Sequence, residues 1–279
     1  MKIINKLFTL PALLLCISIN AEPFDSTYIA KPSATSLLKN ANIYDGEGNE
    51  FFGYDLLIVD GKIDAIGLNL LSKANNTVEY DLEGMWVTPG IIDLHSHMGV
   101  YSAPGVESSS DGNESTSPVT ADVWAEHSVW TQDPQFSLAL QGGVTTFHVL
   151  PGSANLIGGR GTTFKNVQSN TIQGMKFPNA PHSLKMACGE NPKRVYGSRR
   201  QAPSTRMGNI AGYRKAWIKA SKYRQNMNTY ESKSAEAKEI VSPPTRDLEM
   251  DTLAGVLNGE ILVQNHCYRA EEMAMMIDI

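Results

Sequence analysis

Apolar and polar residues in the first third of the chain alternate in short runs that end at turn residues. Residues 41–46, 54–63 and 81–87 have the composition of strands. Asp-Gly pairs at Asp45 and Asp60 favour tight hairpins between such strands. This pattern predicts a small β-sandwich module over residues 22–88.

Beyond Gly90 the pattern changes to apolar strands that alternate with longer segments. Helical spacing of apolar residues predicts helices at about 206–226 and 245–258. Strands that alternate with helices indicate a parallel sheet or barrel. Loops rich in polar residues are expected at 102–120 and 189–205. The predicted strands are 91–97, 144–149, 162–167, 183–187 and 261–266.

Two histidines end the first of these strands. The run Ile91-Ile92-Asp93-Leu94 follows a Pro-Gly turn and leads to His95 and His97. Side chains two residues apart on a strand point the same way. Both imidazoles can therefore reach one metal ion at roughly 2.0–2.1 Å. The alternative is a pair of histidines in a surface loop.

Lys185 and His266 extend this histidine pair on the fourth and fifth predicted strands. A lysine ammonium has no lone pair, so lysine binds metal only after carbon dioxide converts it into a carbamate, which acts as a bridging carboxylate. Glu190 is the rival bridging ligand. Without a metal, Lys185 would be an interior lysine paired with an acid.

Composition describes an ordinary globular protein with an export signal. The chain has 279 residues, is 42% hydrophobic, and carries a net charge of −5, which gives no reason to expect a nucleic-acid or anionic-membrane partner. Lys2 and Lys6 precede an apolar stretch at 7–19 that is too short for a normal membrane span. Residues 1–21 are therefore predicted to be a cleaved signal peptide, so the protein is expected to be periplasmic or secreted.

The remaining polar residues give weaker signals. Cys188 and Cys267 could pair in an exported protein, but each lies beside a candidate metal-site residue, and we expect both to be small buried hydrophobes. His127 and His148 are expected to pack rather than bind. The arginines at 194, 199 and 206 could hold a substrate carboxylate or lie in solvent.

Several of these motifs together resemble the amidohydrolase superfamily, in particular its imidazolonepropionase-like and prolidase-like members. The resemblance covers the amino-terminal portion of that family. The matching segments are Asn42 to Gly46, Asp60 to Gly67, Pro89 to His97, Gly143 to Thr146, Pro151 to Asn155, Leu184 to Pro192 and Asn265 to Ala270.

This resemblance implies a (β/α)8 barrel with a β-sandwich, and hydrolysis of a carbon–nitrogen bond by water that a divalent metal activates. By this resemblance one or two ions, zinc in our expectation, would be held by His95, His97 and His266, with a carbamylated Lys185 as the bridge. Substrates would be small molecules or short peptides. The candidate substrate-binding residues are Arg194, Arg206 and Tyr268.

One departure from the family pattern concerns the carboxyl-terminal half. The family also uses a histidine after the sixth strand and a catalytic aspartate after the eighth, whereas this sequence ends soon after His266. Residues 89–279 are therefore expected to form an incomplete barrel of about five strands, with the catalytic residue unknown. We expect a shortened gene, or a second polypeptide, a carboxyl-terminal half chain, that supplies the rest. A homo-oligomer is the other expected form of association. The alternative function is a non-catalytic exported fragment or pseudoenzyme.

Overall fold

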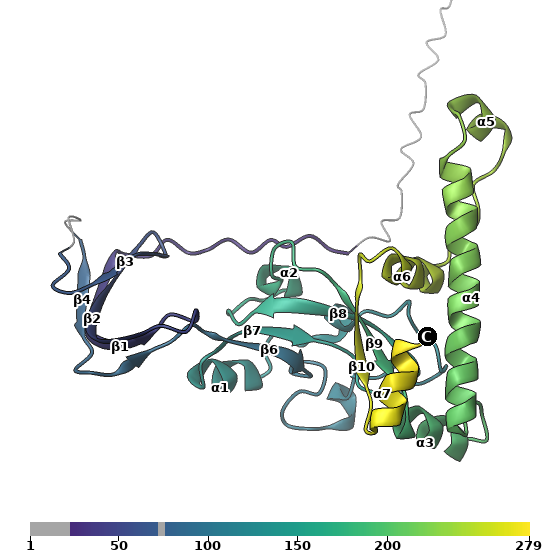
Figure 1. Ribbon diagram of the computed structural model, residues 1–279, viewed down its shortest axis with the longest axis horizontal. Helices are drawn as coiled ribbons and strands as arrows, with labels where there is room; N and C mark the ends of the chain where they lie inside the picture. Colours follow the sequence, from purple (N-terminus) through teal and green to yellow (C-terminus); the bar gives the residue numbers. More distant parts are fainter. Residues whose placement is uncertain (1–22, 72–75) are drawn as a thin grey trace, which may run out of the picture.

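The computed structural model describes residues 23–71 and 76–279, and it consists of two β-sheets set apart along the long axis of the molecule (Figure 1). The predicted signal peptide, residues 1–21, lies outside the described residues. In the part of the chain that is described, no helix is long and apolar enough to cross a membrane.

The first sheet is the predicted β-module, and it forms one curled sheet within the described residues. Its strands follow the order β3-β2-β1-β4, with β5 also paired to β1. Ala41, Ile43 and Leu56 are buried at its centre. Asp60 and Gly61 both have positive φ angles, as a tight turn between β2 and β3 requires. The strands are β1 (Ser36–Tyr44), β2 (Glu50–Val59), β3 (Lys62–Gly67), β4 (Val78–Asp81) and β5 (Trp86–Val87).

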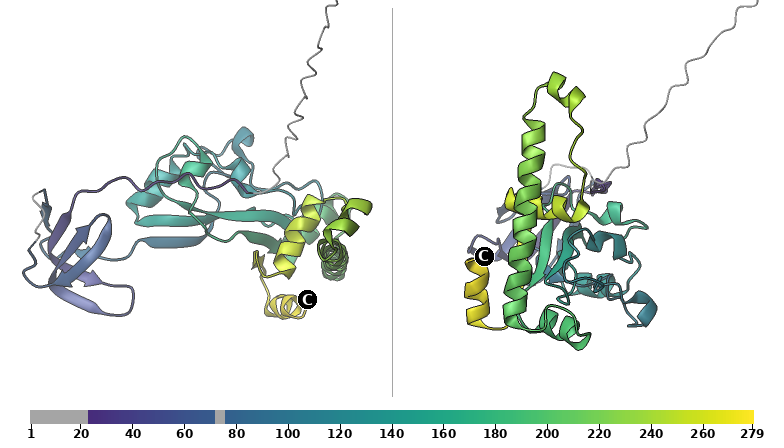
Figure 2. Two further views of the ribbon diagram at one scale, coloured as in Figure 1. Left: turned by 90° about the horizontal axis from the view of Figure 1, so that it is seen from above. Right: turned by 90° about the vertical axis from the view of Figure 1, so that its right-hand side faces the viewer.

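The second sheet curls into half of a barrel, which confirms the predicted α/β fold with about five barrel strands (Figure 2). Its strand order is β10-β9-β8-β7-β6. The pairs β6–β7 and β9–β10 are parallel, as the sequence predicts. The strands are β6 (Ile91–Ser96), β7 (Val144–Val149), β8 (Ile157–Lys165), β9 (Ser183–Ala187) and β10 (Leu262–His266).

The middle strand of this sheet corrects the expectation of a fully parallel arrangement. β8 includes most of the predicted strand 162–167, but it runs antiparallel to both neighbours, with Phe147 opposite Phe164 and Arg160 opposite Leu184. A parallel crossover needs a dozen or more residues, usually with a helix. Residues 150–156 between β7 and β8 are too few and contain no helix, so the chain returns antiparallel.

The predicted helices are confirmed as α4 and α6, and one predicted loop is wrong. The loop expected at 189–205 contains α3, whose first turn includes Glu190 and tolerates Pro192. α4 extends further than predicted and begins at an N-cap, Thr205. The helices are η1 (Glu107–Ser109), η2 (Ala125–Ser128), α1 (Gln135–Gln141), α2 (Ile172–Met175), α3 (Glu190–Ser198), α4 (Arg206–Glu231), α5 (Ala235–Ile240), α6 (Leu248–Leu257) and α7 (Ala270–Ile277).

Packing on one face of β9 decides which side chains face the other way. Leu184 and Met186 are buried against Tyr213 of α4 and Leu253 of α6. Burying an aliphatic side chain of this size contributes about 1.5–3 kcal/mol. Because strand residues alternate, this packing turns Lys185 and its neighbours at 183 and 187 toward the opposite face.

Candidate metal centre

Side chains from β6, β9 and β10 form a small cluster at the carboxyl ends of the strands. The Nζ atom of Lys185 lies 3.1 Å from Nε2 of His95. The ring centroids of His95 and His97 are 5.1 Å apart, so the two imidazoles are neighbours, as their spacing on the strand predicts. His266 ends β10, next to Ala187 of β9 in the strand register.

A backbone contact fixes the orientation of the His97 ring. Its Nδ1 lies 2.9 Å from the carbonyl oxygen of Leu150, just after β7. A carbonyl oxygen can only accept a hydrogen bond, so Nδ1 carries the proton and donates it. The lone pair of Nε2 is then available, which is the arrangement usual for a metal-binding histidine.

His266 has a buried ring nitrogen without a partner. Its Nε2 is buried and forms no hydrogen bond within residues 23–71 and 76–279. The ring of Tyr268 packs edge-on against it, with centroids 4.5 Å apart. A buried polar atom that lacks a partner costs about 1–3 kcal/mol, and native structures rarely leave one so. A metal ion is one group that would satisfy it.

Lys185 is only 2% exposed, and no carboxylate of the described chain forms an ion pair with it. Burial lowers the pKa of its amine to about 8. Burial also lowers the pKa of His95 and of His266, and the positive charge of Lys185 lowers both further. The described structure therefore does not contain the ion pair between this lysine and an acid that was the alternative. When Lys185 is protonated, its positive charge has no carboxylate of the described chain in an ion pair with it.

The donor chemistry of the cluster fits a divalent metal only if the lysine takes part. Across the residues that the structure describes, no three His, Cys, Asp or Glu side chains lie close enough to hold one ion. The three histidines therefore do not form a complete site by themselves. Lys185 lies at hydrogen-bond distance from His95, so conversion of its amine into another group would change the set of atoms available to bind a metal ion beside His95.

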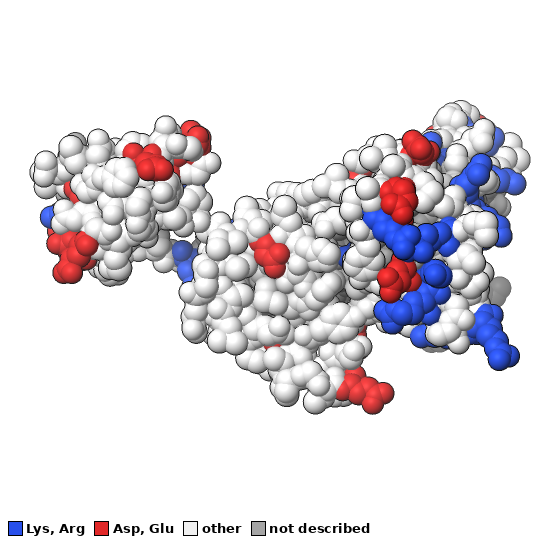
Figure 3. Space-filling view, turned by 60° about the horizontal axis from the view of Figure 1, so that its bottom comes forward, with Lys and Arg blue, Asp and Glu red and all other residues white. Residues whose placement is uncertain are grey.

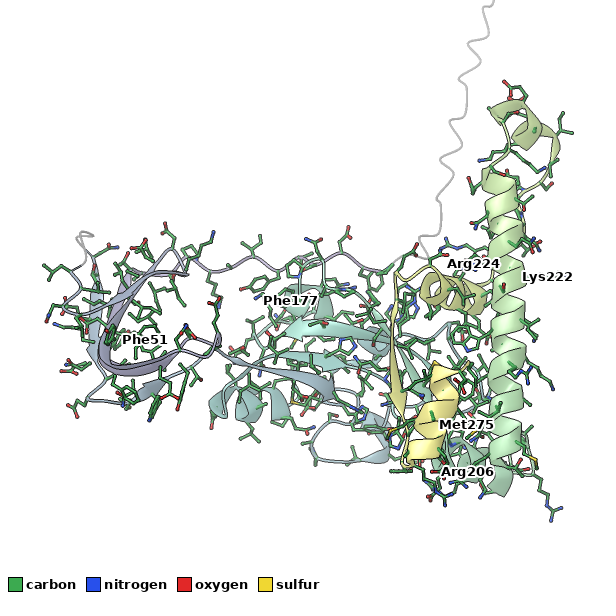
Figure 4. All side chains as sticks on the ribbon, viewed as in Figure 1. Phe51, Phe177, Arg206, Lys222, Arg224 and Met275 are labelled. Carbon is green, nitrogen blue, oxygen red and sulfur yellow. A yellow bond between two sulfur atoms is a disulfide. The ribbon has the colours of Figure 1, made fainter. Side chains whose placement is uncertain are left out.

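The other predicted site residues lie around this cluster with different surroundings. Glu190 is exposed at the start of α3, and in the described chain it forms no hydrogen bond with the cluster. Arg194 is exposed on the same helix. Arg206, at the base of α4, donates from Nε to Glu272 at 2.6 Å (Figure 4). The hydroxyl of Tyr268 lies 3.5 Å from Asn191 Oδ1.

Sequence reasoning missed the polar layer beside the cluster. His148 is buried, as predicted, and its two ring nitrogens lie 2.9 Å from Thr163 Oγ1 and 2.6 Å from Ser183 Oγ. Burial lowers the pKa of His148 to about 4. Ser183 shares the face of Lys185 two residues later, and that spacing was the available signal. His127 is exposed and stacks on Trp124 beside a cavity of about 400 Å³.

The cysteines correct the expectation of two unpaired hydrophobes. Cys188 and Cys267 form a disulfide, with Cα atoms 5.4 Å apart. The reason is strand register: Ala187 lies opposite His266, so the next residue of each parallel strand meets the other. Each cysteine directly follows the end of a site-bearing strand, which was the signal in the sequence.

Comparison with known proteins identifies relatives that share most of this chain. An amidohydrolase from Thermotoga maritima MSB8 superposes with a TM-score of 0.78 at 36% identity, over 87% of this chain and 61% of that chain. The amidohydrolase tasK of Hapsidospora irregularis is 30% identical over 278 residues, which cover 90% of this chain and 28% of that protein. No family model matches.

A shorter stretch matches a further group of enzymes. The dihydroorotase of Ligilactobacillus salivarius is 42% identical over 71 residues, or 25% of this chain and 15% of that protein. The chain thus spans about three fifths of the length of the Thermotoga protein and just over a quarter of tasK.

Proposed function

The chain belongs to the amidohydrolase superfamily over the portion that it shares with these relatives, and we propose that it hydrolyses a carbon–nitrogen bond with the help of a bound metal ion. Its substrate would be a small cyclic amide, an acyl-amino acid or a short peptide. Similarity to hydrolases of the family supports the reaction class.

One observation carries this proposal: a buried lysine without an acidic partner in the described chain lies 3.1 Å from a histidine of a three-histidine cluster. An ordinary buried lysine would need a carboxylate to offset the loss of hydration. A pKa of about 8 leaves a useful fraction of the Lys185 amine neutral near neutral pH. The neutral amine is the form that reacts with carbon dioxide.

Carbamylation would convert the mismatched cluster into a metal site. The lone pair of the neutral Lys185 nitrogen forms a bond to the carbon of carbon dioxide, one carbon–oxygen π bond opens to place its electron pair on oxygen, and the nitrogen loses a proton to solvent. The product is an anion with two oxygen donors, so the net charge beside His95 falls from positive to negative. We assign the metal ligands as His95, His97, His266 and this carbamate, with Glu190 as the alternative bridge.

A divalent ion bound there, zinc by our proposal, would lower the pKa of water toward ~7 and polarise the scissile carbonyl. The chain's own residues orient the ligands: the Leu150 carbonyl holds His97, and Tyr268 packs against His266. We propose that Tyr268 and Arg194 contact substrate. Arg206 would have to release Glu272 to do the same.

We also propose that the protein is exported. The predicted signal peptide motivates this assignment, and the disulfide between Cys188 and Cys267 supports it, because disulfides persist mainly in oxidising compartments. Detection of the mature chain in the periplasm or medium, with a new amino terminus near residue 22, tests it.

The direct test of function is turnover. Purified protein loaded with zinc should hydrolyse at least one member of a panel of cyclic amides, acyl-amino acids and dipeptides, and His95→Ala should abolish that activity. Proton transfer has no assigned residue, because the Asp93 carboxylate beside the cluster accepts from the backbone amide of His95 at 3.0 Å and, in the described chain, forms no hydrogen bond with the side chain of Lys185 or of a ligand histidine. That observation favours the alternative, in which the protein is a non-catalytic member of the family. Zinc binding without any turnover would support this alternative.

A further inference from the structure

The disulfide occupies a position directly beside a proposed metal ligand. Cys188 and Cys267 are the first residues beyond the paired ends of β9 and β10. The amide of Cys188 donates to the carbonyl oxygen of His266 at 2.9 Å. The covalent link and this hydrogen bond therefore join the two strands at the end where His266 presents its unpartnered Nε2.

The two ends of the disulfide are held very differently. Cys188 is 3% exposed, and the buried amide group of Asn209 on α4 donates to its carbonyl at 2.9 Å and to that of Gly189 at 2.8 Å. The backbone at Gly189 also packs directly against the Glu272 carboxylate, because a Cβ atom there would overlap it. The Cys188 end is fixed by packing even without the disulfide.

The Cys267 end has weaker support. β10 is an edge strand of the described sheet and pairs only with β9, and its Leu262 and Val263 side chains are exposed. Beyond Cys267, the backbone amides of Tyr268 and Arg269 donate to Glu272 at 3.3 Å each. The ladder with β9 ends at His266, so beyond it the covalent link and the contacts to Glu272 fix the position of the chain.

A reductant can reach this end of the link. Cys267 is partly exposed and lines a cavity of about 490 Å³ together with Met273 and Ile277. Thiol–disulfide exchange requires access of a thiolate to one of the two sulfur atoms, and the accessible sulfur here belongs to Cys267.

We propose that the Cys188–Cys267 disulfide positions His266, so that its redox state sets the affinity of the site for divalent metal. This inference rests on the proposed function, in which His266 is a ligand. A dithiol reductant attacks Sγ of Cys267 and forms a mixed disulfide; its second thiol then releases Cys267. Two protein thiols and one oxidised reductant result. The end of β10 then moves away from Lys185, and the site loses a ligand.

The experiment compares zinc affinity between redox states of the full chain. Zinc is titrated in competition with a chromophoric chelator, using air-oxidised protein, phosphine-reduced protein freed of reductant, and the double variant Cys188→Ser/Cys267→Ser. We expect no free thiols before reduction, two afterwards, and at least tenfold weaker zinc binding in both the reduced protein and the variant. Reductant should not change the variant. Circular dichroism checks that every sample remains folded. If the variant does not fold, the comparison of oxidised with reduced wild type tests the proposal.

Each other result overturns the inference in a recognisable way. Free thiols at both positions in air-oxidised protein would show that the link does not form. Equal zinc affinity before and after reduction would remove the positioning role and leave the proposed metal site intact. Tighter binding after reduction would make the cysteines ligands instead. Absence of zinc binding in every state would reject the proposed function and this inference together.

Discussion

The amine of Lys185 lies 3.1 Å from Nε2 of His95, and both side chains are basic. Two groups that could both be cationic are held together, and no carboxylate of the described chain forms an ion pair with Lys185. Coulomb repulsion makes this arrangement unfavourable unless one group stays neutral or becomes an anion. The predictions about metal binding follow from this relationship.

Removal of one histidine should weaken zinc binding. We expect His97→Ala to lower zinc affinity at least tenfold, because the ring that Leu150 orients is lost from the donor set. His127→Ala is the matched control, since that histidine is exposed and stacks on Trp124. Elemental analysis after dialysis measures the effect, and equal zinc content in wild type and His97→Ala would refute the assignment.

Replacement of the lysine should separate the two candidate bridges. If Lys185 carries a bridging carbamate, Lys185→Ala loses one of two bound metal ions, and added short carboxylic acids restore it by supplying the missing oxygens. Glu190→Ala should bind metal like the wild type, because Glu190 is exposed at the start of α3. Metal-to-protein ratios give the answer. The reverse pattern would assign the bridge to Glu190.

Acid should destabilise the metal-free protein through His148. Burial lowers its pKa from about 6.5 to about 4, so the folded state binds fewer protons than the unfolded state between these values. The stabilisation is complete above pH ~6.5 and is lost as the pH falls toward 4, at about 1.4 kcal/mol per pH unit. Urea unfolding with chelator at pH 7 and pH 4.5 should show a loss of about 2–3 kcal/mol from this group.

The control for acid destabilisation is His148→Gln, which keeps polar contacts but does not titrate. His182 also has a pKa lowered to about 4 by burial, so it contributes to the loss in both proteins. The variant should therefore lose less stability than the wild type over the same pH interval. Equal losses in the two proteins would show that His148 is not responsible.

A buried ion pair offers a test of the fold itself. Glu126 is 0% exposed and accepts from Lys176 Nζ at 2.7 Å and from Thr162 at 3.0 Å. Lys176→Met should lower the free energy of unfolding by about 3–5 kcal/mol, because it leaves a buried carboxylate without its counter-charge.

The double variant Lys176→Met/Glu126→Gln should recover part of this loss, since it removes the stranded charge as well. Urea midpoints for the wild type, both single variants and the double variant complete the cycle. Independent effects of the two substitutions would show that the pair does not act as a unit.

The sequence predicted the strands that carry the site because each combines strand-forming residues with a bounding turn. The rings of His95 and His97 are neighbours, as expected, although β6 ends at Ser96 and its register shifts before that residue. Strand direction was not predictable from composition. The residues of β8 would suit a parallel strand, but the short connection before β8 decides its antiparallel orientation.

Contacts between distant segments account for what the sequence did not reveal. The pairing of Cys188 with Cys267 depends on the register of two strands separated by α3 to α6. The partner of Arg206 likewise comes from α7, as the neighbouring positions of Arg206 and Met275 in Figure 4 show. Neither relationship follows from local propensity.

The distribution of surface charge was also not predictable from the sequence. The net charge of −5 gives no hint that basic side chains gather over the helical end of the molecule (Figure 3). Helices α3 and α4 carry exposed basic residues, among them Arg194, Lys215, Lys219 and Lys222. Total charge averages over segments that the fold separates in space.

The measurement that tests the central claim most directly is anomalous X-ray scattering from a crystal grown with zinc and bicarbonate. We predict a zinc peak within ligand distance of His97 Nε2 and His266 Nε2, with extra density continuous with Lys185 Nζ that fits a carbamate. A fully loaded crystal with unmodified Lys185, and with zinc only at other positions, would contradict the account.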